Sequence, residues 1–486
     1  MLFSSIPFLY YFLPAVVICY FLISWAVEGG MKCLGVDGDK ARKAGLFTKN
    51  LILLAFSLVF YAWGEPLYVF LMIGTILMFW GTGWAIGAAT SKFWRRFWLI
   101  FAIVSSIGIL AVFKYADFFI ENVRALTGLN IALLKLALPV GISFYTFQAL
   151  SYTIDVYRGD TQVQKDPVSF GAYVTLFPQL IAGPIVRYVD VARELKDRTH
   201  TWSNISLGLR RFLVGLGKKI ILADNFALLM EMFRQSGDQS VAFYWIYVLA
   251  FALNIYFDFS GYSDMAIGLG KIFGFNFIEN FNYPYMSKSV AEFWRRWHMS
   301  LGSWFRDYIY IPLGGNRVGK ARWVFNTLVV WMLTGFWHGA SWNFILWGLL
   351  YAVCLMIEKW VPALQKLPGF FRHLYTLLVV AFGWVLFNAT DLSQLGADLS
   401  GLLGLNGLPL CSAETIYYLR SFALVLVLGI IGSTPFVRDT ANRLQSSRRF
   451  GAVTTVVEVL VMLGILLICT GYLVDGAFSP FLYFRF

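Results

Sequence analysis

A histidine stands near the middle of a segment that is otherwise suited to lipid. The chain has only four histidines, and His338 lies in "TGFWHGASWNFILWG" (334–348), whose other residues are almost all apolar, aromatic or small. Ionisable side chains at membrane depth are costly, so each is first treated as a functional site. Desolvation favours the neutral imidazole, which can accept a proton. His338 is therefore a candidate general base, and the alternative is a core histidine hydrogen-bonded to a neighbouring helix.

The neighbours of His338 predict a tight aromatic pocket. On a helix, Trp342 and Ile345 share its face, because they follow it by four and seven residues. Gly335 and Gly339 are four residues apart, a spacing of small residues that lets a second backbone approach closely. Such a pocket would keep water away from the imidazole.

A second histidine, His298, lies in "EFWRRWHMSLGSWFRDYIYIPLGG" (292–315). Charged side chains alternate here with aromatic ones, which predicts a helix at the cytoplasmic interface with its charges facing a polar cavity. The alternative is an ordinary interfacial anchor. The two remaining histidines, His200 and His373, lie among loop or helix-end residues and receive no role. The charged residues of the segment are Glu292, Arg295, Arg296, Arg306 and Asp307.

A third polar stretch, "NIYFDFSGYSDMAIG" (254–268), follows an apolar run directly. Asp258 and Asp264 flank Ser260 and Gly261. We expect these residues to break the helix within the membrane, an arrangement tolerated only where protein or a water-filled cavity covers the backbone. The purely structural alternative is a helix cap and turn, in which Asp258 or Ser260 accepts hydrogen bonds from backbone amides at a helix end.

The composition defines the elements that must position these residues. Of 486 residues 59% are hydrophobic, 18% aromatic and only 14% charged, against roughly a quarter charged in soluble domains. This predicts an all-α, polytopic bundle of about 10–12 spans, some of the short ones re-entrant or interfacial. The first run is expected to be a retained span and not a signal peptide. The candidate spans are 6–27, 48–63, 66–89, 97–113, 131–152, 169–186, 241–257, 325–337, 342–358, 374–388, 420–434 and 452–474.

The basic residues predict the orientation. The formal net charge is +12, but lysines and arginines cluster in short loops between apolar runs, which indicates topology signals and not a nucleic-acid partner. Residues 32–49 and 92–96 are therefore expected in the cytoplasm and the amino terminus outside. The later basic stretches expected in the cytoplasm are 187–219, 288–322 and 438–449.

Several reaction and architecture classes find no support. The sequence contains no P-loop, no HExxH and no GxSxG motif, and its five scattered cysteines lack metal or redox spacing, so no metal site is expected. A proton-coupled transporter that uses an intramembrane histidine with Asp258 and Asp264 remains an alternative. Transporters usually carry internal repeats, and none is visible here. One membrane domain, residues 1–486, is the simplest organisation.

Eight segments carry a resemblance over nearly the full length. They resemble the membrane-bound O-acyltransferase (MBOAT) family, within it the bacterial branch of alginate O-acetyltransferase membrane subunits, whose relatives act on peptidoglycan, cellulose and, by D-alanyl transfer, teichoic acid. The segments are "MLFSSIPFLYYFLP" (1–14), "LPVGISFYTFQALSYTIDVYRGD" (138–160), "FPQLIAGPIVRY" (177–188), "GLGKKIILADN" (215–225), "YFDFSGYSDMAIGLG" (256–270), "FWRRWHMSLGSWFRDYIYIPLGGNR" (293–317), "TGFWHGASWNFILWG" (334–348) and "SPFLYFRF" (479–486).

The resemblance implies a fold, a donor and partners. It implies a helical bundle crossed by a tunnel, with a catalytic core at about 130–360, in the bacterial cytoplasmic (inner) membrane. His338 matches the invariant catalytic position and His298 the second position, which is His or Asn in the family. The donor would be cytosolic acetyl-CoA, with no permanently bound cofactor. A separate exported or membrane-tethered esterase-like transferase would complete delivery to a polysaccharide acceptor.

Residue chemistry and resemblance together predict an O-acetyltransferase. His338 would deprotonate an acceptor hydroxyl, since acyl transfer needs a base and a dry site. His298 would position the thioester or polarise its carbonyl. D-alanyl or other acyl transfer is an alternative to acetyl transfer, and the sequence does not identify the polymer among alginate, peptidoglycan, cellulose and other exopolysaccharides. The expected pocket residues are Trp337, Trp342, Asn343 (to hold the acyl oxygen), Asp258 and Ser260, with Arg295, Arg296 and Arg306 for donor phosphates unless they are only topology signals.

Overall fold

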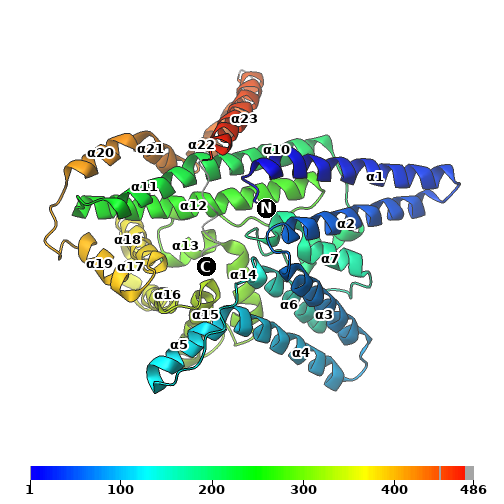
Figure 1. Cartoon of the computed structure of the whole chain (residues 1–486), viewed down its shortest axis with the longest axis horizontal. Helices are drawn as coiled ribbons and strands as arrows, with labels where there is room; N and C mark the ends of the chain where they lie inside the picture. Colours follow the sequence, from blue (N-terminus) through cyan, green and yellow to red (C-terminus); the bar gives the residue numbers. More distant parts are fainter. Residues whose placement is uncertain (1, 448–449, 477–486) are drawn as a thin grey trace. The chain divides into compact units, whose positions relative to one another are not determined.

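The computed structural model describes residues 2–447 and 450–476, and within these ranges every regular element is a helix (Figure 1). This confirms the predicted all-α class. The carboxy-terminal motif at 479–486 lies outside the described residues.

Eight helices of the described chain are long and apolar enough to cross a membrane, and a bent pair would make a ninth. The pair is α20 (Ala413–Ser421) with α21 (Ala423–Gly432), bent by 60°. The chain is therefore a multi-pass membrane protein. The eight are Phe8–Cys33, Gly38–Ala62, Tyr68–Ala88, Lys92–Thr127, Val241–Ile272, Trp342–Trp360, Gly369–Asn388 and Gly451–Val474.

The predicted number of 10–12 spans is too high by this measure, because three expected spans take other forms. The stretch 131–152 is irregular up to Gly141 and then enters α6 (Ile142–Arg158), a buried helix of only 17 residues. The stretch 169–186 breaks into two short buried helices. The stretch 325–337 lies in α15 (Lys320–His338). The first turns of this helix contain charged and polar residues, and it is not among the helices apolar enough to span a membrane.

The chain forms two compact units. The first comprises Met1–Phe212 and Ser263–Ile278. Its core is rich in aromatic rings; Phe177, for example, lies 5.7 Å from Phe60 and 6.1 Å from Phe8 between ring centroids. Its helices are η1 (Phe8–Phe12), α1 (Leu13–Cys33), α2 (Gly38–Ala62), α3 (Tyr68–Ala88), α4 (Lys92–Leu110), η2 (Ala111–Tyr115), α5 (Ala116–Thr127), α6, α7 (Pro167–Thr175), α8 (Phe177–Leu180) and α9 (Tyr188–Lys196).

The second unit comprises Leu213–Tyr262 and Glu279–Phe486, and it contains both predicted site histidines. Two helices, α10 (Trp202–Gly217) and α12 (Val241–Ile272), contribute residues to both units. The other helices of the second unit are η3 (Lys218–Ala223), α11 (Asp224–Gln235), η4 (Pro284–Met286), α13 (Val290–Arg296), α14 (Met299–Phe305), η5 (Arg306–Tyr310), α15, α16 (Trp342–Trp360), α17 (Pro362–Lys366), α18 (Gly369–Asn388), α19 (Leu392–Leu402), α20, α21, α22 (Phe436–Gln445) and α23 (Gly451–Val474).

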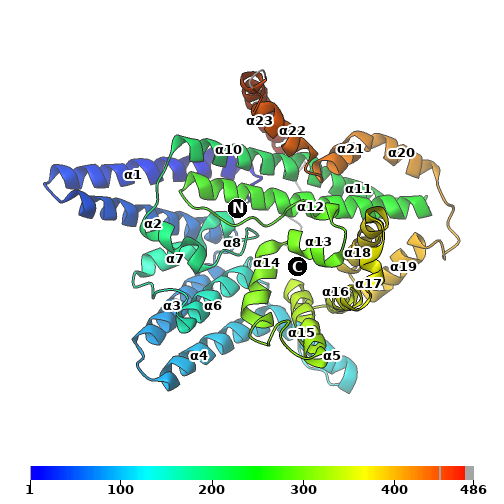
Figure 2. The same ribbon diagram turned by 180° about the vertical axis from the view of Figure 1, so that it is seen from behind.

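Glycines set the close approach of α15 and α16, which pack side by side (Figure 2). A Cβ atom added at Gly335 would lie 2.2 Å from the Phe344 carbonyl oxygen, and one at Gly348 2.3 Å from the Trp331 carbonyl oxygen. Real Cβ atoms do not approach oxygen so closely, so only glycine allows this backbone contact. The predicted close approach at Gly335 is confirmed.

The expected break near Asp258 is wrong, because α12 continues without interruption from Val241 to Ile272. Its glycines serve packing instead of turning the chain. In the second unit a Cβ at Gly261 would lie 2.8 Å from the Gly215 carbonyl oxygen. Asp258 does not cap a helix end but pairs with Lys219, whose Nζ lies 2.8 Å from its carboxylate. Helix α12 thereby accommodates these polar residues without a break.

Candidate active site

A cavity of about 1020 Å³ opens within the second unit. This volume is at the upper end of the range typical of small-molecule sites. The cavity lies among α13, α14, η5, α15 and α16, with residues of α17 and the start of α18 completing the wall. Several of its lining side chains come from segments far apart in the sequence, so the tertiary fold assembles it.

The lining of the cavity is strongly basic. Its single acidic residue among those described, Glu358, accepts hydrogen bonds from the backbone N–H groups of Val290 (2.6 Å) and Ala291 (3.0 Å) at the start of α13. Both oxygens of that carboxylate are therefore used to cap the amino terminus of α13. Such a cavity favours an anionic ligand, because Lys and Arg recognise phosphate groups. The basic lining residues are Lys288, Arg295, Arg306, Lys359 and Arg372.

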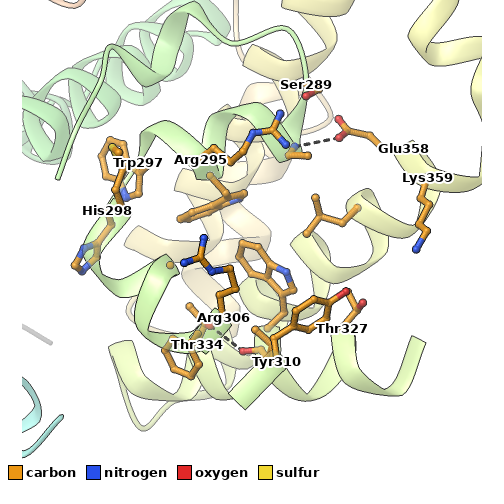
Figure 3. A pocket seen from close by; sticks show the side chains of 18 of the residues that line it. Ser289, Arg295, Trp297, His298, Arg306, Tyr310, Thr327, Thr334, Glu358 and Lys359 are labelled. Carbon is orange, nitrogen blue, oxygen red and sulfur yellow. Dashed lines mark hydrogen bonds between the residues drawn. The ribbon is translucent and has the colours of Figure 1, made fainter. Parts of the chain in front are cut away.

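The cavity is elongated along one face of α15. It runs from Trp323 to Thr334 on that helix, which corresponds to about 16 Å at 1.5 Å per residue. Lys359 marks one end, with its Nζ 3.6 Å from the centroid of the Trp323 ring. Figure 3 shows His298 at the opposite end, with Arg295 and Arg306 between the two.

His298 sits where α13 ends and α14 begins, so the predicted helix through it is interrupted. Its backbone has φ +46° and ψ +52°, a left-handed conformation uncommon for a residue with a side chain. The ring is buried, and Nδ1 lies 3.2 Å from Oδ1 of Asn280. Nε2 finds no hydrogen-bond partner among the described residues. Burial lowers the pKa of His298 to about 3, so its ring is neutral at pH 7.

His338 is the last residue of α15, and its side chain is buried. The ring lies 5.1 Å from Trp337, 5.2 Å from Trp347 and 5.2 Å from Phe387, between centroids. Its centroid is 6.5 Å from that of His298. The fold thus brings together the two histidines singled out in the sequence, in an aromatic pocket behind the cavity end. We call them the histidine pair.

The expected helix face around His338 is only partly present. The helix ends at His338, and Gly339 has an extended backbone (φ −168°) before α16 begins at Trp342. Trp342 therefore does not follow His338 on one helix, and its side chain is 51% exposed. Trp337, by contrast, is buried with its ring centroid 6.0 Å from that of His298.

Asn343 lies nearby but faces the wrong way for its expected role. Its Nδ2 group donates to the carbonyl oxygens of Leu386 (3.3 Å) and Ala389 (2.9 Å) at the end of α18. Both amide hydrogens are therefore directed at the backbone, and a group that holds an acyl oxygen must donate. This geometry favours a structural role for Asn343, in which it links α16 to the carboxy-terminal end of α18.

Asp258 belongs to a separate buried charge cluster. Lys219 lies 2.8 Å from both Asp258 and Asp224. Burial disfavours the Lys219 ammonium, but the two carboxylates outweigh this effect and raise its pKa. Ser260 is buried on the same helix. The link of this stretch to the histidine pair is Phe259, whose ring lies 4.7 Å from that of His298.

The three predicted arginines divide into two groups. Arg295 and Arg306 line the cavity, although Arg306 is also paired with Asp307 at 2.7 Å. Arg296 instead pairs with Glu292 at 2.8 Å and donates to the Asn282 carbonyl oxygen. It lies on the turn of α13 that supports the cavity wall.

The sequence did not reveal four residues of the site. Lys359 and Arg372 come from the end of α16 and the start of α18, where basic residues are ordinary topology signals. Lys288 looked like part of a loop. Asn280 lies in an irregular segment 18 residues before His298, and only the folded chain places its amide against the imidazole.

Comparison with known proteins places this site in a family context. The model of the membrane-bound O-acyltransferase family matches residues 163–395, which include both histidines. The chain is 36% identical to a probable alginate O-acetylase of Pseudomonas putida, covering 100% of both chains. It is 33% identical to a peptidoglycan O-acetyltransferase of Helicobacter pylori, covering 100% of this chain and 98% of the relative. It is 30% identical to a teichoic acid D-alanyltransferase of Bacillus subtilis, covering 51% and 67% respectively.

Proposed function

The chain belongs to the membrane-bound O-acyltransferase family and is a multi-pass O-acyltransferase, and we propose that its donor is cytosolic acetyl-CoA. It would pass the acetyl group across the bacterial inner membrane for O-acetylation of a cell-envelope polysaccharide. The observation that carries this proposal is the basic cavity that ends at His298, whose ring centroid lies 6.5 Å from that of His338.

The shape and charge of the cavity suit an elongated donor with an anionic head. Lys359 lies at the end away from His298, where it would contact a phosphate of coenzyme A, and Arg372 adds a second positive charge to the cavity lining. Residues 288–322 are expected on the cytoplasmic side, and because α15 begins within this stretch we infer that the Lys359 end of the cavity is the entrance from the cytosol. The thioester would then lie beside His298, about 16 Å along α15 from the entrance.

His338 is proposed as the general base. It takes the proton of the acceptor hydroxyl as the oxygen attacks the thioester carbonyl carbon. The C–S bond breaks, an ester C–O bond forms, and the departing thiolate is protonated. General-base assistance contributes roughly 10²–10⁴ in rate. The rings of Trp337, Trp347 and Phe387 around His338 exclude the water that would otherwise hydrolyse the donor.

The acceptor is proposed from the relatives. Those relatives are named for alginate and for peptidoglycan, both polysaccharides. We infer an envelope polysaccharide here as well, reached through an exported or membrane-tethered esterase-like transferase. The similarity to a D-alanyltransferase keeps a second acyl group, D-alanyl, as a candidate cargo.

The transporter alternative is weaker in the folded chain. A proton relay would use Asp258 and Asp264, but each carboxylate is already held by a cation. Lys219 lies 2.8 Å from Asp258 in the second unit, and Arg211 lies 2.8 Å from Asp264 in the first. Neither carboxylate is among the described residues that line the cavity, so neither connects the histidine pair to an opening.

The test is acetyl transfer by the full chain in membrane vesicles given acetyl-CoA. We expect His338→Ala to lower the rate of thioester consumption by about 10²-fold or more. The matched control is His373→Ala, because His373 lies on α18, where its Nδ1 is 2.9 Å from the Ser287 carbonyl oxygen. Rates are compared per amount of protein in the membrane. Near-normal turnover by His338→Ala would reject the base assignment.

A further inference from the structure

Asn280 forms several hydrogen bonds with the turn that contains His298. Its Oδ1 atom lies 3.2 Å from His298 Nδ1 and accepts hydrogen bonds from the Ser300 backbone N–H (3.2 Å) and hydroxyl (2.9 Å). Its backbone carbonyl accepts a fourth bond, from the Met299 N–H (3.0 Å). Asn280, His298 and Ser300 are all buried. One side chain therefore holds both the ring and the backbone around it.

The Ser300 contact fixes the orientation of the amide. A backbone N–H can only donate, so the Asn280 atom facing it must be the oxygen and not the nitrogen. The nitrogen, Nδ2, is directed elsewhere and has no partner among the described residues. If the Asn280 amide were flipped, its Nδ2 group would face the Ser300 backbone N–H, and both groups are donors.

The amide orientation in turn fixes the tautomer of His298. Because Oδ1 can only accept, Nδ1 of His298 must carry the proton in that contact. A neutral imidazole has one N–H, so Nε2 is left with its lone pair. That atom is buried and has no hydrogen-bond partner within the described chain.

Within the described chain, the side chains found around His298 favour this neutral state. Its ring centroid lies 4.7 Å from that of Phe259 in α12, 6.0 Å from that of Trp337 in α15 and 6.5 Å from that of His338. Arg295 of α13 and Arg306 of η5 line the same cavity, and positive charge there disfavours an imidazolium. The acidic neighbour of Asn280 in sequence, Glu279, is exposed.

We propose that Asn280 is a positioning residue for acyl transfer, which holds His298 with Nε2 as a hydrogen acceptor at the deep end of the donor cavity. This inference rests on the proposed function. It decides between the two roles open to His298: polarising the thioester carbonyl needs an N–H at the free nitrogen, whereas this tautomer offers a lone pair. His298 therefore keeps the other role: Nε2 accepts a hydrogen bond from an N–H or O–H group and so positions the donor, while His338 takes the proton of the acceptor hydroxyl.

Two substitutions of Asn280 separate this role from a structural one. Asn280→Ala removes the acceptor, so we expect kcat to fall at least about tenfold while KM for acetyl-CoA changes less than about twofold. Asn280→Asp keeps an oxygen for all the bonds, and its negative charge favours protonated His298. The acid limb of its pH–rate profile should therefore move to higher pH, with activity recovering as the pH is raised.

The matched control is Asn254→Ala. Asn254 is equally buried in the second unit, but its amide donates to the Ala223 carbonyl oxygen (2.8 Å) away from the histidine pair. We expect its kcat to stay within about twofold of the parent and its pH profile to be unchanged. If Asn280→Ala does not accumulate in the membrane, Asn280→Asp alone carries the test, since it preserves the hydrogen bonds.

The outcomes distinguish this inference from the proposed function. An Asn280→Asp profile that coincides with the parent profile, or an Asn280→Ala kcat equal to that of Asn254→Ala, would overturn the positioning role. Loss of activity in His298→Ala under the same conditions would leave the proposed function intact. If the parent protein leaves acetyl-CoA unconsumed, the proposed function itself fails.

Discussion

At the scale of single residues, burial determines what the histidine pair can do. His298 is surrounded by aromatic rings and is neutral at pH 7, and His338 has a comparable apolar shell. His338 could be singled out from the sequence because a titratable ring in an apolar run is costly, whereas His298 was singled out by its charged, aromatic segment and by the family resemblance. Asn280 was not predictable, since asparagine is common in loops and only the tertiary contact identifies it.

The low pKa of His298 should appear in the stability of the protein. The ring takes up a proton near pH 6.5 when unfolded but only near pH 3 when folded. The unfolded state therefore binds more protons between these values, and stability falls as the pH drops through that window. By pH 5 the loss is about 2 kcal/mol.

Replacing His298 by Asn removes this titration. We expect the Tm of the purified full chain in detergent to fall less between neutral and mildly acidic pH in His298→Asn than in the parent. Thermal unfolding followed at several pH values measures the difference. Parallel pH dependence in the two proteins would contradict a neutral, buried ring.

The arginines of the cavity should govern donor affinity. Because Arg306 lines the cavity and Arg296 pairs with Glu292 outside it, the two offer a matched comparison. Arg306→Gln should raise KM for acetyl-CoA by about 3- to 10-fold with little change in kcat, since it removes a positive charge that would bind the donor between its entrance and its reacting end. Steady-state kinetics in vesicles measures this, and an equal effect from Arg296→Gln would remove the argument for phosphate contact.

At the scale of elements, glycine contacts position the site. Gly335 and Gly348 allow α15 and α16 to touch by backbone, and this holds His338 and Trp347 against each other. The spacing of small residues made the contact at Gly335 predictable. The continuity of α12 was not predictable, because Asp, Ser and Gly are typical of turns, and only the Lys219 partner and the Gly215 backbone explain them within a helix.

The substitution Gly335→Ala tests the contact between α15 and α16. Gly335→Ala places a Cβ 2.2 Å from the Phe344 carbonyl oxygen, so the helices must separate. We expect a loss of about 1–3 kcal/mol in stability together with reduced acetyl transfer. Gly464→Ala is the control, because a Cβ there meets no atom within 4 Å. Equal Tm values for the two variants would show that the contact does not constrain the helices.

At the scale of the whole molecule, the membrane class followed directly from composition, while the number of spans did not. Apolar runs reveal helices that face lipid, but a buried helix such as α7 gives a similar run because protein covers it. Periodicity and length alone do not separate the two cases. The cavity could not be predicted from the sequence either, since its wall combines α13–α15 with the end of α16 and the start of α18.

The orientation makes its own prediction. Cys33 is exposed and follows Lys32 in a segment expected in the cytoplasm. In a Cys411→Ser variant, which lacks the other exposed thiol, a membrane-impermeant maleimide should label Cys33 in inside-out vesicles and not in right-side-out ones. Labelling only in right-side-out vesicles would reverse the orientation and with it the cytosolic entrance of the cavity.

The most direct test of the central claim follows both halves of the donor in inside-out vesicles supplied with acetyl-labelled acetyl-CoA on the outer, cytoplasmic face. The account predicts one free coenzyme A thiol outside for each acetyl group that reaches acceptor in the lumen, with both products lost in His338→Ala. Intact acetyl-CoA, or labelled donor that enters the lumen unchanged, would contradict acyl transfer by this protein.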